Sequence, residues 1–168
     1  MKLPLPPGVE FHEDIGLLVY RPRGLLNRAA ISKIIAVIGE LEHSVREPFN
    51  RFLDTVAADA VDLDLEYIRG VSLYRRRLYG NRPPVKVAIL ATHTAMADYG
   101  QLHASLTEGS PISVRVFQDR KEVADWLRVP VELLVPKRGA DAKRSSHKKS
   151  NMTMKQQTQP DKLSTSND

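Results

Sequence analysis

The sequence predicts an α/β domain in which a mixed sheet of about five strands is flanked by about four helices, in the order ββαβαβαβα. Strand-like and helix-like apolar patterns alternate along residues 9–130. The run VKVAIL at Val85–Leu90 is apolar almost throughout, which is typical of a strand covered on both faces. Helices between the later strands imply parallel pairing through right-handed crossovers. Apolar residues make up 42% of the 168 residues, which is enough for a packed core.

Five segments predict the strands. Residues 9–13 and 17–20 form a predicted hairpin, because Asp14 and Gly16 supply turn chemistry between them. The third strand is predicted at residues 49–56 (FNRFLDTV), and VKVAIL is the fourth. Apolar and polar residues alternate at 112–116, which predicts a half-buried fifth strand.

Apolar residues at helical spacing predict four helices, each with a capping residue at its start. The predicted caps are Asn27, Asp62 or Asp64, Thr94 and Asp119. The predicted inward face of the second helix consists of Tyr67, Val71, Tyr74 and Leu78. The same helix carries three consecutive arginines, 75–77, which point about 100° apart and cannot form one compact cluster. We therefore predict a solvated face for them.

The charge distribution separates a neutral domain from a basic tail. Residues 1–136 hold 17 lysines and arginines against 17 acidic residues, whereas residues 137–168 hold eight against three. The tail has one leucine and no aromatic residue, so we expect it to be disordered and at most a weak binder of polyanions. With residues 1–8 as an N-terminal arm, the expected folded domain spans 9–136.

The absence of cysteine excludes disulfides and thiolate metal sites. The opening MKLPLPPG is too polar for a signal peptide, and no apolar run approaches the ~20 residues that cross a bilayer. We expect a cytoplasmic protein that is not transmembrane and has no specific nucleic-acid partner. His93 and His103 lack a third ligand, so no metal site is expected. Neither glycine signature for phosphate binding occurs, so no cofactor is expected.

Three stretches carry a family resemblance: VKVAIL, the E-G-S-x-I-x-V-R-V-F run at 108–117, and the D-R-x-E-x-x-x-W-L run at 119–127. With them, residues 9–130 resemble bacterial SpoIIAA-like proteins of the STAS superfamily, whose structural relatives are the CRAL-TRIO lipid-transfer domains. The resemblance implies a SpoIIAA-like fold and a regulatory role. In the best-understood relatives, a Ser or Thr after the third strand is phosphorylated. Thr55 is the one hydroxyl in the corresponding stretch LDTVAADAVDLD, so it is the candidate phosphosite.

Topology predicts where a site would lie, because ligands of open parallel sheets bind beyond the carboxyl ends of the strands. The candidate ligand or partner residues are Arg23, Asn27, Asp54, Thr55, Asp62, His93 and Thr94. A histidine beside an aspartate can act as a general base, so Asp54, Thr55 and His93 form the minimal catalytic set. Helix capping and loop hydrogen bonding are the alternative roles of these residue types.

Three functions stay open at this point. The first is a non-enzymatic regulatory module that docks a protein partner through Asp62 and the exposed side of the second helix. The second is a small-ligand or lipid-binding domain with a pocket between helices and sheet, indicated by the CRAL-TRIO kinship and by Met96 and Tyr99, which we predict to point inward. The third is an enzyme. Because the sequence shows no complete catalytic set, we expect a binding or regulatory protein.

Overall fold

The structure is a computed structural model that describes residues 4–45 and 47–137 of the chain. The chain divides into two units, Met1–Val135 and Pro136–Asp168, and every helix and strand given below belongs to the first. The basic tail predicted at 137–168 lies outside the described residues, apart from Lys137. Within the described part of the chain, no helix is long and apolar enough to cross a membrane.

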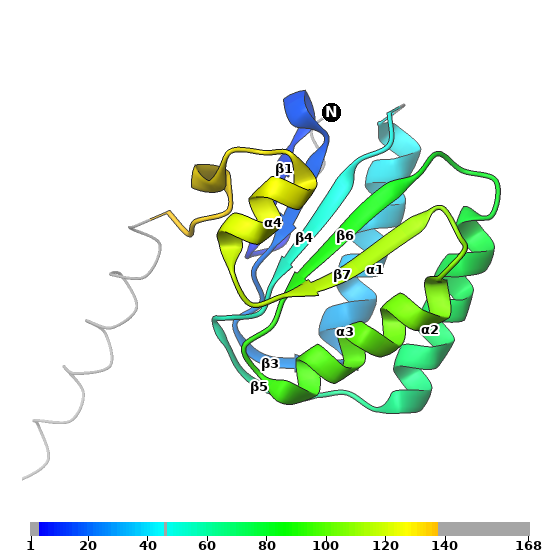
Figure 1. Cartoon of the computed structure of the whole chain (residues 1–168), viewed down its shortest axis with the longest axis vertical. Coiled ribbons are helices and arrows are strands. Elements are labelled where there is room, and N and C mark those ends of the chain that lie inside the picture. Colours follow the sequence, from blue (N-terminus) through cyan, green and yellow to red (C-terminus); the bar gives the residue numbers. More distant parts are fainter. Residues whose placement is uncertain (1–3, 46, 138–168) are drawn as a thin grey trace, which may run out of the picture. The chain divides into compact units, whose positions relative to one another are not determined.

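A five-stranded mixed sheet forms the centre of the first unit (Figure 1). Its strands, in spatial order, are β1 (Val9–His12), β2 (Leu17–Tyr20), β4 (Asn50–Asp54), β6 (Val85–Leu90) and β7 (Ile112–Phe117). β1 pairs antiparallel with β2, and the remaining neighbours are parallel. The hairpin turns through a short 3-10 segment, η1 (Glu13–Ile15), and Gly16 follows it with φ 58°, a left-handed conformation that glycine adopts without strain. The predicted α/β fold class is confirmed.

Helices cover both faces of this sheet. They are α1 (Arg28–Ser44), α2 (Leu65–Tyr79), α3 (Thr94–Thr107) and α4 (Arg120–Leu127). The strand alternation divides the core: Leu17 and Val19 pack with α4, whereas Leu18 packs with α1. The 3-10 segment η2 (Val131–Leu133) lies beside α4 (Figure 1). On the opposite face, α1, α2 and α3 cover the sheet, and a space remains between these helices and the sheet.

A second, two-stranded parallel sheet was not predicted. It pairs β3 (Gly24–Asn27) with β5 (Ala58–Asp62). Both strands are short, and β5 is mostly exposed, so neither has the apolar alternation that identifies a strand in a sequence. Asp62 therefore ends a strand, and of the two predicted alternatives for the cap of the second helix, Asp62 and Asp64, it is not the one that the structure uses.

Asp64 is the residue that caps α2, because its Oδ1 accepts the Tyr67 N–H at 2.8 Å. That bond, followed by the guanidinium of Arg28, lowers the pKa of Asp64. The predicted cap at Thr94 is wrong. His93 occupies the cap position of α3 without a capping bond from its side chain, and Thr94 is the first helical residue.

Helix α2 presents a different face to the interior from the one predicted. Its buried residues are Ile68, Ser72, Arg75 and Tyr79, and Tyr74, predicted inward, is 58% exposed. The buried face is one position C-terminal to the predicted apolar stripe, so it brings a hydroxyl and a guanidinium inside. The solvated role predicted for Arg75 is therefore wrong, since this side chain is only 6% exposed.

Candidate functional site

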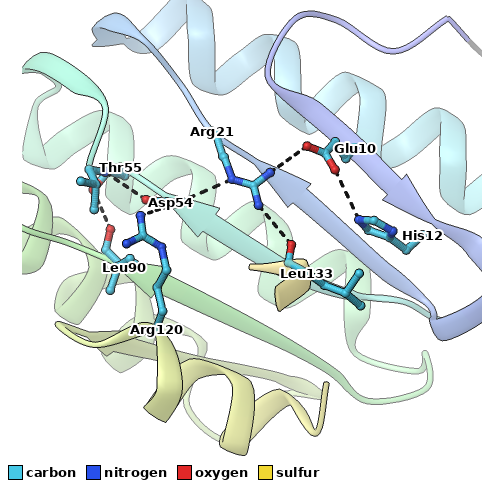
Figure 2. A network of polar contacts seen from close by, with 9 residues as sticks. Glu10, His12, Arg21, Asp54, Thr55, Leu90, Arg120 and Leu133 are labelled. Atoms are coloured by element: carbon cyan, nitrogen blue, oxygen red, sulfur yellow. Dashed lines mark hydrogen bonds and ion pairs between the residues drawn. The ribbon is translucent and has the colours of Figure 1, made fainter. Parts of the chain in front are cut away.

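Two of the predicted site residues, Asp54 and Thr55, lie together at the carboxyl end of β4 (Figure 2). Asp54 is buried, and its Oδ2 accepts a hydrogen bond from Arg120 Nη2 at 2.9 Å. Arg21 Nε lies 3.8 Å from the same oxygen. The predicted edge of the sheet thus holds a buried carboxylate between two arginines, neither of which the sequence singled out.

Arg21 extends this network to strand β1 and to the segment η2 that follows α4. Its Nη1 donates to Glu10 Oε1 at 3.0 Å, and its Nη2 donates to the carbonyl of Leu133 at 3.1 Å. Figure 2 shows the resulting chain of contacts from β1 across β2 and β4 to α4. Two arginines face two carboxylates here, so the charges balance. We infer that the network fastens the last turn of the domain to the sheet.

Thr55 is fully buried, and its Oγ1 donates to the Leu90 carbonyl at 2.7 Å. Its backbone N–H donates to the same carbonyl at 3.1 Å. Phosphorylation of this hydroxyl would require the β4–β6 junction to open, because a kinase must reach the oxygen. The phosphosite stays a prediction that this conformation does not favour.

Two of the remaining predicted residues, Asn27 and His93, serve local structure. Asn27 Oδ1 accepts the Ala30 N–H at 3.0 Å and caps α1. His93 Nε2 donates to the Ala58 carbonyl of β5 at 3.1 Å, so the histidine of the predicted catalytic set is bonded to a strand. Arg23, Asp62 and Thr94 are exposed. In the described part of the chain, His93, Asp54 and Thr55 form hydrogen bonds with other residues and not with one another.

A cavity of about 130 Å³ lies between α1, α2, α3 and the sheet. Apolar side chains form most of its wall, among them Ile34, Ile38, Ile68, Ile89 and Met96. Tyr99 also lines it and donates its hydroxyl to the Leu63 carbonyl at 2.6 Å. Met96 and Tyr99 therefore point inward, as the sequence indicated. A dry cavity of about 150 Å³ is large enough to bind benzene, so this space can hold a molecule of that order of size.

Arg51 and Arg75 are the charged residues of the cavity wall. Arg51 is the second residue of β4 and is only 4% exposed. Its Nη2 bonds Glu42 and the hydroxyl of Tyr79, and Arg75 Nη2 bonds that same hydroxyl at 3.5 Å. Both guanidinium groups also lie over the Tyr79 ring, 5.2 and 5.0 Å from its centroid. The two cations are thus neighbours inside the protein.

Positive charge exceeds negative charge in this cluster. Glu42 Oε2 accepts a second bond, from Arg82 Nη1 at 3.0 Å, so one carboxylate serves two arginines. Among the described residues, no carboxylate lies within ion-pair distance of Arg75. Burial first, and then the charge of Arg75, lower the pKa of Arg51 to about 9, against the opposing effect of Glu42.

Two nitrogens of Arg51, Nε and Nη1, are buried without a hydrogen-bond acceptor in the described part of the chain. A buried donor without a partner costs about 1–3 kcal/mol, and more when the group is charged. Most buried polar groups in proteins are paired for this reason. A buried cation that shares its one carboxylate with Arg82 and has two nitrogens without an acceptor, at a cavity wall, therefore needs an explanation.

His103 lines the same cavity in its neutral form. Ser72 Oγ donates to the Ile68 carbonyl at 2.7 Å, so its lone pair accepts the proton of His103 Nδ1, 2.8 Å away. Burial, followed by the charges of Arg75 and Arg51, lowers the pKa of His103 to about 4. The cavity wall consequently carries cationic and neutral polar groups. In the described residues no cluster of three His, Asp or Glu side chains could hold a metal ion.

The sequence did contain a signal for Arg51. In FNRFLD the residues Phe49, Arg51 and Leu53 alternate, so they share one face of the strand. A charged residue between two apolar ones on a covered face indicates either a buried ion pair or a ligand-binding group. Arg75 gave no comparable signal, because its neighbours in sequence are also arginines.

The structure defines a class: an α/β domain with a largely apolar cavity between helices and sheet, whose wall includes two arginines. Comparison with known proteins adds little to that description. No protein-family model matches the chain, and no curated protein matches it. The chain is similar to a solved structure from Shewanella loihica PV-4, an uncharacterized protein of the DUF3478 family described as having a SpoIIAA-like fold. The two are 18% identical with a TM-score of 0.48, over 76% of this chain and 98% of the other.

Proposed function

We propose that this protein is a non-enzymatic module that binds a small apolar ligand in the cavity between α1, α2, α3 and the sheet. The observation that supports this most strongly is the cavity of about 130 Å³ with an almost wholly apolar wall. Ligand sites in proteins are lined mainly by apolar side chains with a few placed polar groups, and this space has that composition. The volume favours a ligand the size of a single ring over a long-chain lipid.

A binding role is also supported by what the polar residues do. Asp54, Thr55 and His93 each bond a structural partner, and the catalytic set does not form through hydrogen bonds among these residues. A general base must reach the proton that it removes, directly or through one water. We therefore propose binding without chemistry.

Blocking the cavity tests this function. Val71→Phe adds a ring at the cavity wall, and Val56→Phe adds the same ring at a position that is 42% exposed and is not part of the wall. Ligand-observed NMR with benzyl alcohol, a single-ring probe, should show saturation transfer for the wild-type chain and for Val56→Phe. Val71→Phe should abolish it. Equal signals from all three proteins, or none from any of them, would overturn the proposal.

A regulatory role through a protein partner, implied by the family resemblance, is the second candidate. It is favoured by exposed apolar side chains on α2, where Leu65 is 62% exposed and Tyr74 58%. Cross-linking in cell extract should capture a partner with the wild-type chain but not with Leu65→Ser/Tyr74→Ser. Ile15→Ser, at another exposed apolar position, is the control. A capture pattern unaffected by the double substitution removes this candidate.

A further inference from the structure

Two arginines in the otherwise largely apolar wall of the cavity, Arg51 and Arg75, indicate the charge of the ligand that the cavity would bind. Apolar walls select for size and shape, but they give no reason for a charged side chain among them. Burial of an ion costs several kcal/mol even after relaxation, so a buried cation is retained where something compensates its charge. For Arg51, Glu42 is that partner in part only, since Glu42 is shared with Arg82.

Arg75 is also a mostly buried cation, and among the described residues it has no carboxylate within ion-pair distance. It is 6% exposed, it lines the cavity, and its one hydrogen bond given by the structure is the 3.5 Å contact to Tyr79. Two guanidinium groups that share one hydroxyl repel each other. An anion near both would remove the repulsion and would give the unpaired nitrogens of Arg51 an acceptor.

The balanced network at the other end of the sheet provides a contrast within the same molecule. There, two arginines face two carboxylates and a backbone carbonyl. Arg21 Nε and Arg120 Nε also lack a hydrogen-bond acceptor among the described residues, so the contrast between the two clusters is one of charge. The excess of cations occurs where the apolar space is. Arginine is suited to this role, because its planar guanidinium matches a carboxylate and keeps its charge when buried.

We propose that the ligand of this cavity is a small carboxylate whose apolar body fills the space under α2 and α3, and whose carboxylate accepts hydrogen bonds from Arg51 beside Arg75. This inference rests on the proposed function, because it assumes that the cavity is a binding site. Beyond the proposed function, the inference specifies that the ligand is an anion and that Arg51 and Arg75 recognise it. The neutral histidine at the wall is compatible with this arrangement, since it adds no further charge to be neutralised.

A three-probe titration of the full 168-residue chain tests it. Benzoate carries both ring and carboxylate, benzyl alcohol carries the ring with a neutral head, and acetate carries the carboxylate alone. By isothermal titration calorimetry, benzoate should bind at least about tenfold more tightly than benzyl alcohol, the effect of a hydrogen bond to a charged group. Acetate should show no measurable binding, because it cannot fill the apolar space.

Substitutions of the two arginines test whether these residues bind the carboxylate of benzoate. Arg51→Met should weaken benzoate binding by about ten- to a hundredfold and leave benzyl alcohol binding within about twofold. Arg75→Met should act in the same direction. Arg82→Met is the matched control, because Arg82 belongs to the same charged cluster but not to the cavity wall, and it should leave benzoate binding within about twofold. Should Arg51→Met fail to fold, Arg75→Met carries the test.

The possible outcomes separate the two proposals. If benzyl alcohol binds as tightly as benzoate and Arg51→Met changes neither, the cavity binds apolar molecules but the carboxylate inference is wrong. If neither ring compound binds the wild-type chain, both the inference and the proposed function are wrong. If benzoate binds but loses nothing in Arg51→Met and Arg75→Met, the anion is recognised elsewhere and the inference is wrong.

Discussion

Replacing Arg51 by methionine is expected to stabilise the fold, although it removes a buried ion pair. Lowering the pKa of an arginine from 12.5 to about 9 corresponds to about 5 kcal/mol against its charged form. Both the folded and the unfolded chain carry the charge at pH 7, so this cost is fully present there. Methionine has a similar length and no charge, and its sulfur packs well against aromatic rings such as those of Phe49 and Tyr79.

The substitution also removes favourable contacts. The hydrogen bond to the Tyr79 hydroxyl and the contacts of the guanidinium with the Phe49 and Tyr79 rings together contribute about 2–4 kcal/mol. The attraction of Glu42 is already contained in the pKa of Arg51. Neither partner is left alone, because Glu42 keeps Arg82 at 3.0 Å and Tyr79 keeps Arg75. The balance is a gain of about 1–3 kcal/mol.

Urea denaturation at pH 7, followed by far-ultraviolet circular dichroism, measures this gain. With a slope of about 2 kcal/mol per molar urea, the midpoint should rise by about 0.5–1.5 M at unchanged slope. Arg82→Met removes a 44% exposed side chain and should change the free energy of unfolding by less than about 1 kcal/mol. A midpoint for Arg51→Met that falls by more than about 0.5 M would show that Arg51 is retained for stability, and the functional reading of its burial would be refuted.

Other substitutions probe the remaining features. Asp54→Ala removes a buried carboxylate that accepts a hydrogen bond from the half-buried Arg120 and faces Arg21, and should lower the free energy of unfolding by about 1–3 kcal/mol in the same urea assay. Gly100→Ala should destabilise the fold by about 1–3 kcal/mol, because the added Cβ would lie 2.6 Å from the Val116 side chain. Gly70→Ala, which has open space around it, should stabilise α2 by about 0.5–1 kcal/mol. Thermal melts of the two variants check both signs. The imidazole of His103 should titrate near pH 4 by NMR. Since the unfolded chain binds that proton from about pH 6.5 downward and the folded chain does not, stability should fall by about 3 kcal/mol between pH 6.5 and 4, and His103→Asn should lack this component.

The sequence predicts the main sheet and the helices well, because their signals are strong and local. VKVAIL reads as a covered strand, and β6 lies between β4 and β7 with helices on both faces. Asn27 and Asp119 cap helices where their positions before apolar stripes indicate. β3 and β5 were missed because two short strands stabilise each other only after the chain has brought Gly24 and Ala58 together.

The site was predicted at one edge of the sheet, and the cavity lies elsewhere in the fold. Topology correctly brings Asp54 and Thr55 to the carboxyl end of β4, yet the residues that complete the network, Arg21 and Arg120, come from segments far apart in sequence. The cavity depends on which face of α2 turns inward. Choosing the apolar residues as the inward face placed Arg75 in solvent, whereas the fold buries it against Tyr79. Volume left unfilled by packing has no signature in a sequence.

The most direct measurement is a crystal structure of the full chain grown in sodium benzoate. The ring should lie between α2, α3 and the sheet, with a carboxylate oxygen within about 3 Å of an Arg51 nitrogen. An interior filled by rearranged side chains, with benzoate absent from it or bound only at the surface, would contradict the cavity as the binding site.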